Sequence, residues 1–127
     1  MGTPIAPAAK PGKILFVDHD MDHMEVCKEI MSRRGHEVKL LFDTRVLVNV
    51  VKQFMPDIIF MDHYMPHIRG TLATQLLKNH ALLKHIPIIY FSAHHNINEV
   101  AAEAGADTWL AKPFEIERMI ALAEQYI

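Results

Sequence analysis

The sequence lacks several features that would mark a specialised class of protein. It has a single cysteine, Cys27, so no disulfide can form within the chain. None of its apolar runs approaches the roughly 18 residues needed to span a membrane. The formal net charge of −2 gives none of the basic excess typical of proteins that bind nucleic acid or anionic membranes. These absences favour an ordinary globular domain and are compatible with a reducing cytosol.

The remaining composition fits one folded domain. Half of the 127 residues are hydrophobic and 22% are charged, which is typical of globular proteins. Residues 1–12 contain three prolines and no apolar core segment, so we expect a flexible N-terminal tail and not a signal peptide or a helix. No repeat, linker or low-complexity segment follows Gly12. We therefore expect one domain over residues 13–127.

Short apolar runs alternate with amphipathic stretches along this domain. Residues 14–17 and 58–61 have no polar position, as is typical of strands buried on both faces of a parallel sheet. The stretches between such runs repeat apolar residues at helical spacing. The expected strands cover 13–17, 36–42, 57–61, 87–91 and 107–111. The expected helices run from Asp20 or Asp22 to Gly35, from Asp43 or Thr44 to Phe54, and over 71–84, 97–104 and 114–127.

The alternation of strand and helix predicts an α/β fold. Strands joined through helices form a parallel sheet with right-handed crossovers and helices on both faces. In the first helix the apolar face is expected to contain Val26, Cys27, Ile30 and Met31. Cys27 is therefore expected to be a buried and unreactive thiol.

Polar residues stand where four of the expected strands end. Asp18 follows the first strand, Asp62 the third, Ser92 the fourth and Lys112 the fifth. Taken alone, Asp62 is equally well explained as a turn or helix-capping residue. Ligands of parallel α/β sheets, however, bind outside the carboxyl ends of the strands. Two carboxylates, a hydroxyl and an amine meeting there, with a bound cation, would suit phosphoryl chemistry.

These residues lie in motifs that resemble the receiver domain of two-component response regulators, including chemotaxis regulators. The resemblance covers nearly all of residues 13–127 and implies a flavodoxin-like, doubly wound fold with strand order 2-1-3-4-5. The matching motifs are ILFVD at 14–18, PDIIFMD at 56–62, Met65-Pro66 with Gly70, Ser92-Ala93, and Gly105-Ala106-Asp107 leading to Lys112-Pro113-Phe114. Each motif is weak alone, and their order along the chain makes the match strong.

The resemblance implies a role for each strand-end residue. Asp62 would accept a phosphoryl group from a sensor histidine kinase or a phosphotransfer protein. Lys112 would contact the phosphate, and Ser92 would be the switch hydroxyl. Asp18, Asp62 and the main-chain carbonyl of Tyr64 would hold Mg²⁺. The chain would then be a cytoplasmic signalling switch and not an enzyme, with no nucleic-acid or membrane partner.

Output is expected at the face built from residues 97–104, 107–111 and 114–127. By the resemblance, this face would bind a downstream protein effector and could pair in a homodimer. Trp109 occupies the position of the family's switch aromatic, although a half-buried aromatic on an edge strand explains it equally well. The Lys112–Pro113 peptide is expected to be cis, as in the family. No output domain or DNA-binding motif lies within these residues, so a stand-alone regulator and a piece of a longer protein are both open.

The sequence departs from the family at His19, where a second acidic residue is expected. Mg²⁺ prefers oxygen ligands, whereas imidazole suits transition metals. Three alternatives are open: weak Mg²⁺ binding through Asp18, Asp62 and a main-chain carbonyl, another divalent ion that uses His19, or a degenerate receiver that binds partners without phosphorylation. Asp20 fits the start of the first helix better than it fits a replacement ligand.

Histidines are concentrated near the expected strand ends. Each is best explained singly as an exposed loop residue, but together they suggest pH sensitivity or adventitious metal binding. They are His19, His23, His63, His67, His94 and His95. By the resemblance, Tyr64 and His94 line the path of the water that hydrolyses the aspartyl phosphate. Two rings there predict a long-lived phosphoryl group, unless both point to solvent.

An enzyme of the haloacid-dehalogenase type is the main alternative from another class. Its first motif, a strand followed by Asp-x-Asp, matches Asp18-His19-Asp20. Ser92 and Lys112 also follow in the required order. The chain lacks that family's turn after the motif, its second acidic pair and its cap, and Asp62 would have no role. A phosphatase using Asp18 and Asp20 is therefore the weaker hypothesis.

Overall fold

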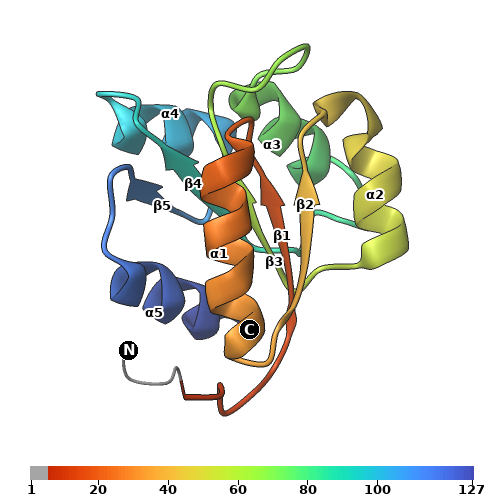
Figure 1. Ribbon diagram of the computed structural model, residues 1–127. Coiled ribbons are helices and arrows are strands. Elements are labelled where there is room, and N and C mark those ends of the chain that lie inside the picture. The colour runs from red at the N-terminus through yellow and green to blue at the C-terminus, as the bar shows by residue number, and fades with distance from the viewer. Residues whose placement is uncertain (1–5) are drawn as a thin grey trace.

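A computed structural model describes residues 6–127 of the chain (Figure 1). Its centre is one parallel sheet of five strands in the order β2-β1-β3-β4-β5. The strands are β1 (Lys13–Val17), β2 (Glu37–Leu41), β3 (Ile58–Met61), β4 (Ile88–Ser92) and β5 (Thr108–Ala111). This is the flavodoxin-like arrangement expected from the sequence.

Helices cover both faces of the sheet. They are α1 (Met21–Arg33), α2 (Leu47–Phe54), α3 (Gly70–Lys78), α4 (Ile97–Ala104) and α5 (Ile116–Tyr126). Helix α1 crosses in front of the strands in Figure 1, and it shares one core cluster with α5. The opposite cluster contains side chains of α2, α3 and α4. The two helical layers therefore cover the three central strands, whereas the edge strands β2 and β5 keep exposed residues such as Glu37, Lys39 and Trp109.

Alternating strand residues build these two cores. Leu15 of β1 packs in the cluster with α2, α3 and α4, whereas its neighbours Ile14 and Phe16 pack in the cluster with α1 and α5. The rings of Phe16 and Phe60 stack with centroids 4.8 Å apart. Every residue of β3 is fully buried. The apolar run before Asp62 is therefore a central strand buried on both faces, as predicted.

Helix α1 differs from the prediction in one position of its apolar face. Asp20 caps it by accepting the His23 N–H at 3.0 Å, as expected. Val26, however, is exposed, because the buried face is formed by Met24, Cys27, Ile30 and Met31. Cys27 is buried, as expected, and burial raises the pKa of its thiol to about 11, which disfavours the reactive thiolate.

Two other helices are shorter than predicted. The second begins as a 3₁₀ turn (Thr44–Val46) capped by Asp43, and it becomes α-helical only at Leu47. The third ends at Lys78, and turns replace the expected continuation to Lys84. His80 accepts the Leu82 N–H through Nδ1, and such local bonds compete with a helix. The turn also lets Leu83 and Ile86 enter the core.

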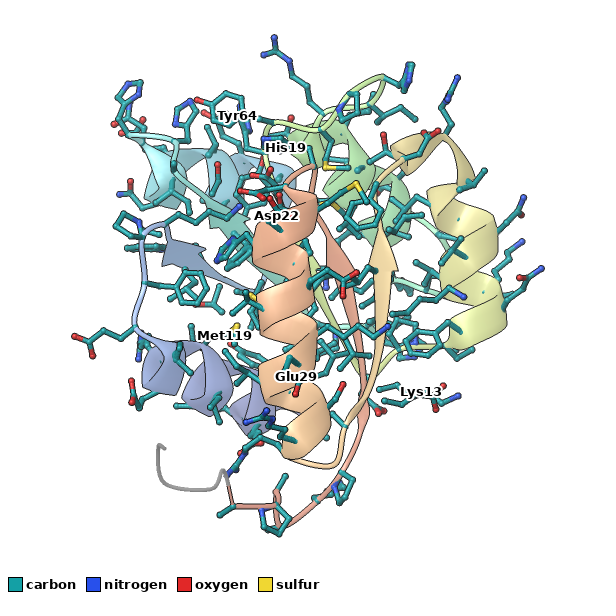
Figure 2. All side chains as sticks on the ribbon, viewed as in Figure 1. Lys13, His19, Asp22, Glu29, Tyr64 and Met119 are labelled. Atoms are coloured by element: carbon teal, nitrogen blue, oxygen red, sulfur yellow. The ribbon has the colours of Figure 1, made fainter. Side chains whose placement is uncertain are left out.

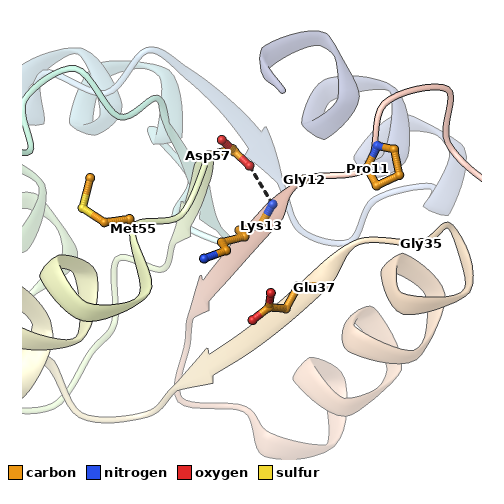
Figure 3. Close-up of a pocket in the computed structure, with 7 residues that line it drawn as sticks. All are labelled: Pro11, Gly12, Lys13, Gly35, Glu37, Met55 and Asp57. Carbon is orange, nitrogen blue, oxygen red and sulfur yellow. Dashed lines mark hydrogen bonds between the residues drawn. The ribbon is translucent and has the colours of Figure 1, made fainter.

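Residues 6–12 contact the end of the sheet at which β1 begins. Gly12 donates its N–H to His36 Nδ1 at 3.0 Å, and Ala8 donates to the Arg34 carbonyl at 2.7 Å. Residues 1–5 of the expected flexible tail lie outside the described residues, so the flexibility of the tail stays a prediction. An open pocket at this end is lined by Pro11, Gly12, Lys13, Gly35, Glu37, Met55 and Asp57 (Figure 3). Within it, Lys13 donates its N–H to Asp57.

Glu124 joins α5 to the segment between α1 and β2, and its substitution should destabilise the fold. Its carboxylate accepts from Arg34 and lies 2.8 Å from His36 Nε2. The Arg34 guanidinium lowers the pKa of Glu124, so the carboxylate stabilises the fold above its unfolded pKa and loses this effect as the pH falls through the folded pKa. Glu124→Gln should cost about 2 kcal/mol at neutral pH.

Urea unfolding at neutral and acidic pH tests this expectation. The difference between wild type and Glu124→Gln should shrink as the pH falls below about 4. Glu29→Gln is the matched control, because Glu29 pairs with Arg33 on the exposed surface of α1. Its cost should stay below about 0.5 kcal/mol. Equal costs for the two variants would contradict the proposed role of Glu124.

Candidate functional site

Asp18, Asp62 and Lys112 meet at the carboxyl edge of the sheet. Asp18 follows β1 and Asp62 follows β3, which pair in register at Val17 and Met61. Main-chain hydrogen bonds continue past the strand ends, because Asp62 donates to the Val17 carbonyl at 2.9 Å and Lys112 donates to the Ser92 carbonyl at 3.0 Å. The sheet therefore fixes the main-chain positions from which the three side chains extend.

The two carboxylates are buried beside one ammonium group. Asp18 is 0% exposed and Asp62 is 1% exposed. Lys112 Nζ donates to Asp18 Oδ2 and lies 4.0 Å from Asp62 Oδ1. Burial and then the Asp18 charge raise the pKa of Asp62, while Lys112 opposes them. One ammonium leaves the pair with excess negative charge, so the site favours an additional cation.

His19 turns its ring into this acidic pair. Its Nδ1 atom lies 2.6 Å from Asp62 Oδ2 and 3.5 Å from Asp18 Oδ1. The ligand atoms of these three residues lie within 4.8 Å of one another. Figure 2 shows His19 and Tyr64 together at the end of the molecule where β1 and β3 finish, with Lys13 at the opposite end. The carboxylates fit Mg²⁺ and other divalent ions, whereas the imidazole fits Mg²⁺ poorly.

Asp20 has a structural role beside this site. Its carboxylate caps α1, and the N–H of His23 holds the pKa of Asp20 below its usual range. Its own N–H donates to Asp18 Oδ1 at 3.0 Å. Asp20 thus fixes the Asp18 side chain and is committed to the helix start, as expected from the sequence.

Ser92 lies between the acidic residues and Lys112 along the sheet edge. It ends β4, which lies between β3 and β5, and it is fully buried. Its Oγ accepts the His94 N–H at 3.2 Å.

Trp109 on β5 is 43% exposed and lines an open pocket with Pro113 and Phe114. The Lys112–Pro113 peptide is cis, which confirms the expectation.

His63 is a site residue that the sequence interpretation missed. It was expected to be an exposed loop residue, but it is buried, with Nδ1 2.6 Å from the Tyr90 hydroxyl. Burial, and then the charge of His94, lower the pKa of His63. The sequence did hold a signal: Tyr90 interrupts an apolar buried strand, and a buried tyrosine hydroxyl needs a hydrogen-bond partner.

Aromatic and imidazole rings from the segments after β3 and β4 contact one another. His63 lies edge-on to His94 and Tyr64, with ring centroids 4.7 and 4.8 Å away. The Tyr64 and His94 rings stack at 6.0 Å, and Tyr64 is 51% exposed. Of the other histidines near strand ends, His23 packs against Phe91 and Phe114 and stays partly exposed. The expected pair of rings beyond Asp62 and Ser92 is thus in mutual contact.

Comparisons with known proteins agree with this geometry. The response regulator receiver domain profile matches residues 14–124. Response regulator MprA of Mycolicibacterium vanbaalenii is 31% identical over 113 residues, which cover 87% of this chain and 48% of MprA. The polar-differentiation response regulator DivK of Brucella anthropi is 24% identical over 92% of this chain and 97% of its own length. The chain therefore spans about half the length of the first relative and nearly all of the second.

Solved structures show the same fold. A putative response regulator from Chloroflexus aurantiacus superimposes with a TM-score of 0.85 at 28% identity, covering 92% of this chain and 98% of the other. Within residues 6–127, no helix has both the length and the apolar character to cross a membrane. The match over most of the chain, together with the acidic strand-end site, establishes that this chain belongs to the response regulator receiver domain family of two-component signalling.

Proposed function

We propose that this receiver accepts a phosphoryl group on Asp62 from the phosphohistidine of a sensor kinase or phosphotransfer protein. One observation carries the proposal: Asp62 and Asp18 are buried as a pair, with the Lys112 ammonium beside them. Burial of two carboxylates costs desolvation free energy, and one ammonium group offsets only part of it. Binding of a cation and a phosphoryl group would explain why the fold keeps this pair.

The transfer forms one bond and breaks one bond. A carboxylate oxygen of Asp62 attacks phosphorus, the new O–P bond forms, and the P–N bond of the donor breaks. The electron pair of that bond stays on the imidazole nitrogen of the donor. Lys112 Nζ, already 4.0 Å from Asp62 Oδ1, can neutralise phosphoryl oxygens as charge gathers on them.

Asp18 and Asp62, with the main-chain carbonyl of Tyr64, would hold a divalent cation at this site. When bound, such a cation shields phosphoryl oxygens from the two carboxylates. The charge balance of the site supports this assignment, since one Lys112 ammonium faces two buried carboxylates. Self-phosphorylation from small donors and slow autodephosphorylation would be the only reactions of the chain itself.

The output surface is proposed to be the face of α4, β5 and α5. Ser92 would contact the phosphoryl group and Trp109 would respond to it. Trp109 is on β5, in register with Tyr90 of β4, and its side chain is partly open to solvent. This face would bind a downstream effector or a second copy of the chain.

Intact-mass measurement tests phosphoryl acceptance. The protein is incubated with acetyl phosphate and a divalent cation, and in parallel with a phosphorylated histidine phosphotransfer protein. We expect the mass increase of one phosphoryl group in at least one of the two reactions. A mass that stays unchanged with both donors would contradict the proposal.

A receiver that binds its partner without phosphorylation is the second candidate. One observation favours it: His19 Nδ1 lies 2.6 Å from Asp62 Oδ2, and this contact blocks one oxygen of the acceptor carboxylate. In that case the partner would bind equally to wild type and to Asp62→Asn. The phosphatase hypothesis is weaker, because the Asp20 carboxylate that it needs is engaged in capping α1.

The rings of Tyr64 and His94 are expected to prolong the life of the phosphoryl group. They stack 6.0 Å apart, two residues beyond Asp62 and Ser92, and we expect them to obstruct water that approaches phosphorus from the side opposite Asp62. Tyr64→Ala and His94→Ala should each shorten the half-life of the phosphorylated protein several-fold. Intact-mass measurements at successive times after donor removal provide the half-lives.

A neighbouring histidine provides the control for this prediction. His67 is exposed in the same loop and has a positive φ of 70°, so asparagine is the least disruptive replacement. His67→Asn should leave the half-life unchanged. Half-lives of Tyr64→Ala and His94→Ala equal to that of wild type would show that the two rings do not obstruct water.

A further inference from the structure

The acidic site offers a metal an imidazole nitrogen from His19 in addition to the carboxylates of Asp18 and Asp62. Two buried carboxylates and one imidazole nitrogen already converge, with all ligand atoms within 4.8 Å of one another. The His19 side chain is 51% exposed and has solvent on one side, yet its Nδ1 contacts Asp62. An exposed ring held against a buried carboxylate is pre-organised as a third ligand.

We propose that this site selects a first-row transition divalent ion over Mg²⁺, with His19 Nδ1 as a ligand beside Asp18 and Asp62. This inference rests on the proposed function, because the metal would bind the same two carboxylates, Asp18 and Asp62. It goes further by assigning a ligand and a class of metal.

The chemistry of the donors carries the selectivity. Mg²⁺ requires near-octahedral oxygen coordination and loses its water reluctantly. Imidazole is a good ligand for zinc, nickel and copper, and mixed nitrogen and carboxylate sites are common for zinc. With His19 against Asp62 Oδ2, Mg²⁺ would have to displace the ring and gain no ligand from residue 19. A transition ion would instead keep all three donors.

The surroundings of His19 leave an entry path for an ion. The ring lines an open pocket of about 420 Å³ together with Tyr64, Met65, Pro66 and Arg69. An ion in this pocket would meet the His19 ring first, and the Nδ1 atom of that ring lies 2.6 Å from Asp62 Oδ2. A metal site requires ligand atoms, a path for the ion and negative charge that the ion can neutralise.

Other histidines require a control, because zinc can bind imidazole elsewhere. The Nδ1 atom of His63 contacts the Tyr90 hydroxyl, and that of His94 accepts the Asn96 N–H at 3.0 Å. His95 stacks on His94 with ring centroids 4.7 Å apart and is exposed. His95→Ala therefore removes an imidazole from this neighbouring cluster and leaves the acidic pair intact.

Calorimetric titration with zinc and with magnesium, without any phosphoryl donor, tests the proposal. Wild type should bind zinc more tightly than magnesium. His19→Ala should weaken zinc binding by at least about tenfold, because even loss of a group that only orients a ligand typically costs ~10–100-fold. His19→Asp should tighten magnesium binding and bring the two affinities closer. His95→Ala should leave the affinity of the acidic site unchanged.

A second measurement assigns the ligand. In a two-dimensional ¹H–¹⁵N spectrum of the imidazole groups, the His19 Nδ1 signal should shift on addition of one equivalent of zinc. An unshifted His19 signal, equal zinc affinities of wild type and His19→Ala, or magnesium binding as tight as zinc binding would each overturn the proposal. Because the titrations contain no phosphoryl donor, these outcomes are independent of whether Asp62 accepts a phosphoryl group.

Discussion

Replacement of Asp62 by asparagine should reduce phosphoryl incorporation to background. The amide is nearly isosteric with the carboxylate but is not a nucleophile toward phosphorus. The fold should tolerate the change, because burial and the Asp18 charge already disfavour the ionised form of Asp62 and raise its pKa. Removal of this charge should therefore raise the unfolding midpoint at neutral pH, and the gain should diminish as acid protonates Asp62 in wild type.

Asp20→Asn is the matched control for this prediction. The substituted side chain would still cap α1, since asparagine and aspartate are comparable N-cap residues. The Asp20 side chain accepts the His23 N–H at 3.0 Å and takes no further part in the proposed transfer. Incorporation near the wild-type level is expected for this variant. Incorporation that survives in Asp62→Asn and disappears in Asp20→Asn would instead favour the phosphatase hypothesis.

Gly70→Ala should have the largest effect on stability. Gly70 begins α3, where its N–H donates to the His63 carbonyl at 3.0 Å. A Cβ atom there would lie 2.1 Å from the Asp62 carbonyl oxygen and 2.9 Å from the His63 Cα. Both contacts are with backbone, so the loop after β3 would have to move. We expect a loss of about 3 kcal/mol or more in urea unfolding, together with slower phosphorylation.

Gly105→Ala distinguishes this contact from a general intolerance of alanine at glycine positions. Gly105 ends α4 with a φ of 84°, and no atom lies within 4 Å of its added Cβ. Its cost should be about 1 kcal/mol, the strain of a left-handed conformation. Phosphorylation should stay at the wild-type rate. Equal losses of stability at the two glycines would contradict the proposed contact between Gly70 and the Asp62 backbone.

The framework of the site could be predicted because it follows from chain order and topology. The apolar run before Asp62 indicated a buried strand, and every residue of β3 is buried. Parallel strands finish at one edge, so polar residues after β1, β3 and β5 had to lie near one another. Asp18, Asp62 and Lys112 do meet there.

Features that depend on tertiary packing could not be predicted in this way. Val26 fits a helical repeat as well as Met24 does, and only the position of the sheet decides which is buried. The rotamer of His19, which brings Nδ1 to Asp62, is a property of the folded loop. The contact of Glu124 with Arg34 and His36 joins segments that are distant along the chain.

The most direct test of Asp62 as the phosphoryl acceptor is to locate the phosphoryl group chemically. Borohydride reduces an acyl phosphate to an alcohol, so it converts a phosphorylated aspartate to homoserine. After treatment with a donor and borohydride, peptide mass spectrometry should find homoserine at position 62 and aspartate at positions 18 and 20. Homoserine at position 18 or 20, or its absence at position 62 in protein that has gained the phosphoryl mass, would show that Asp62 is not the acceptor.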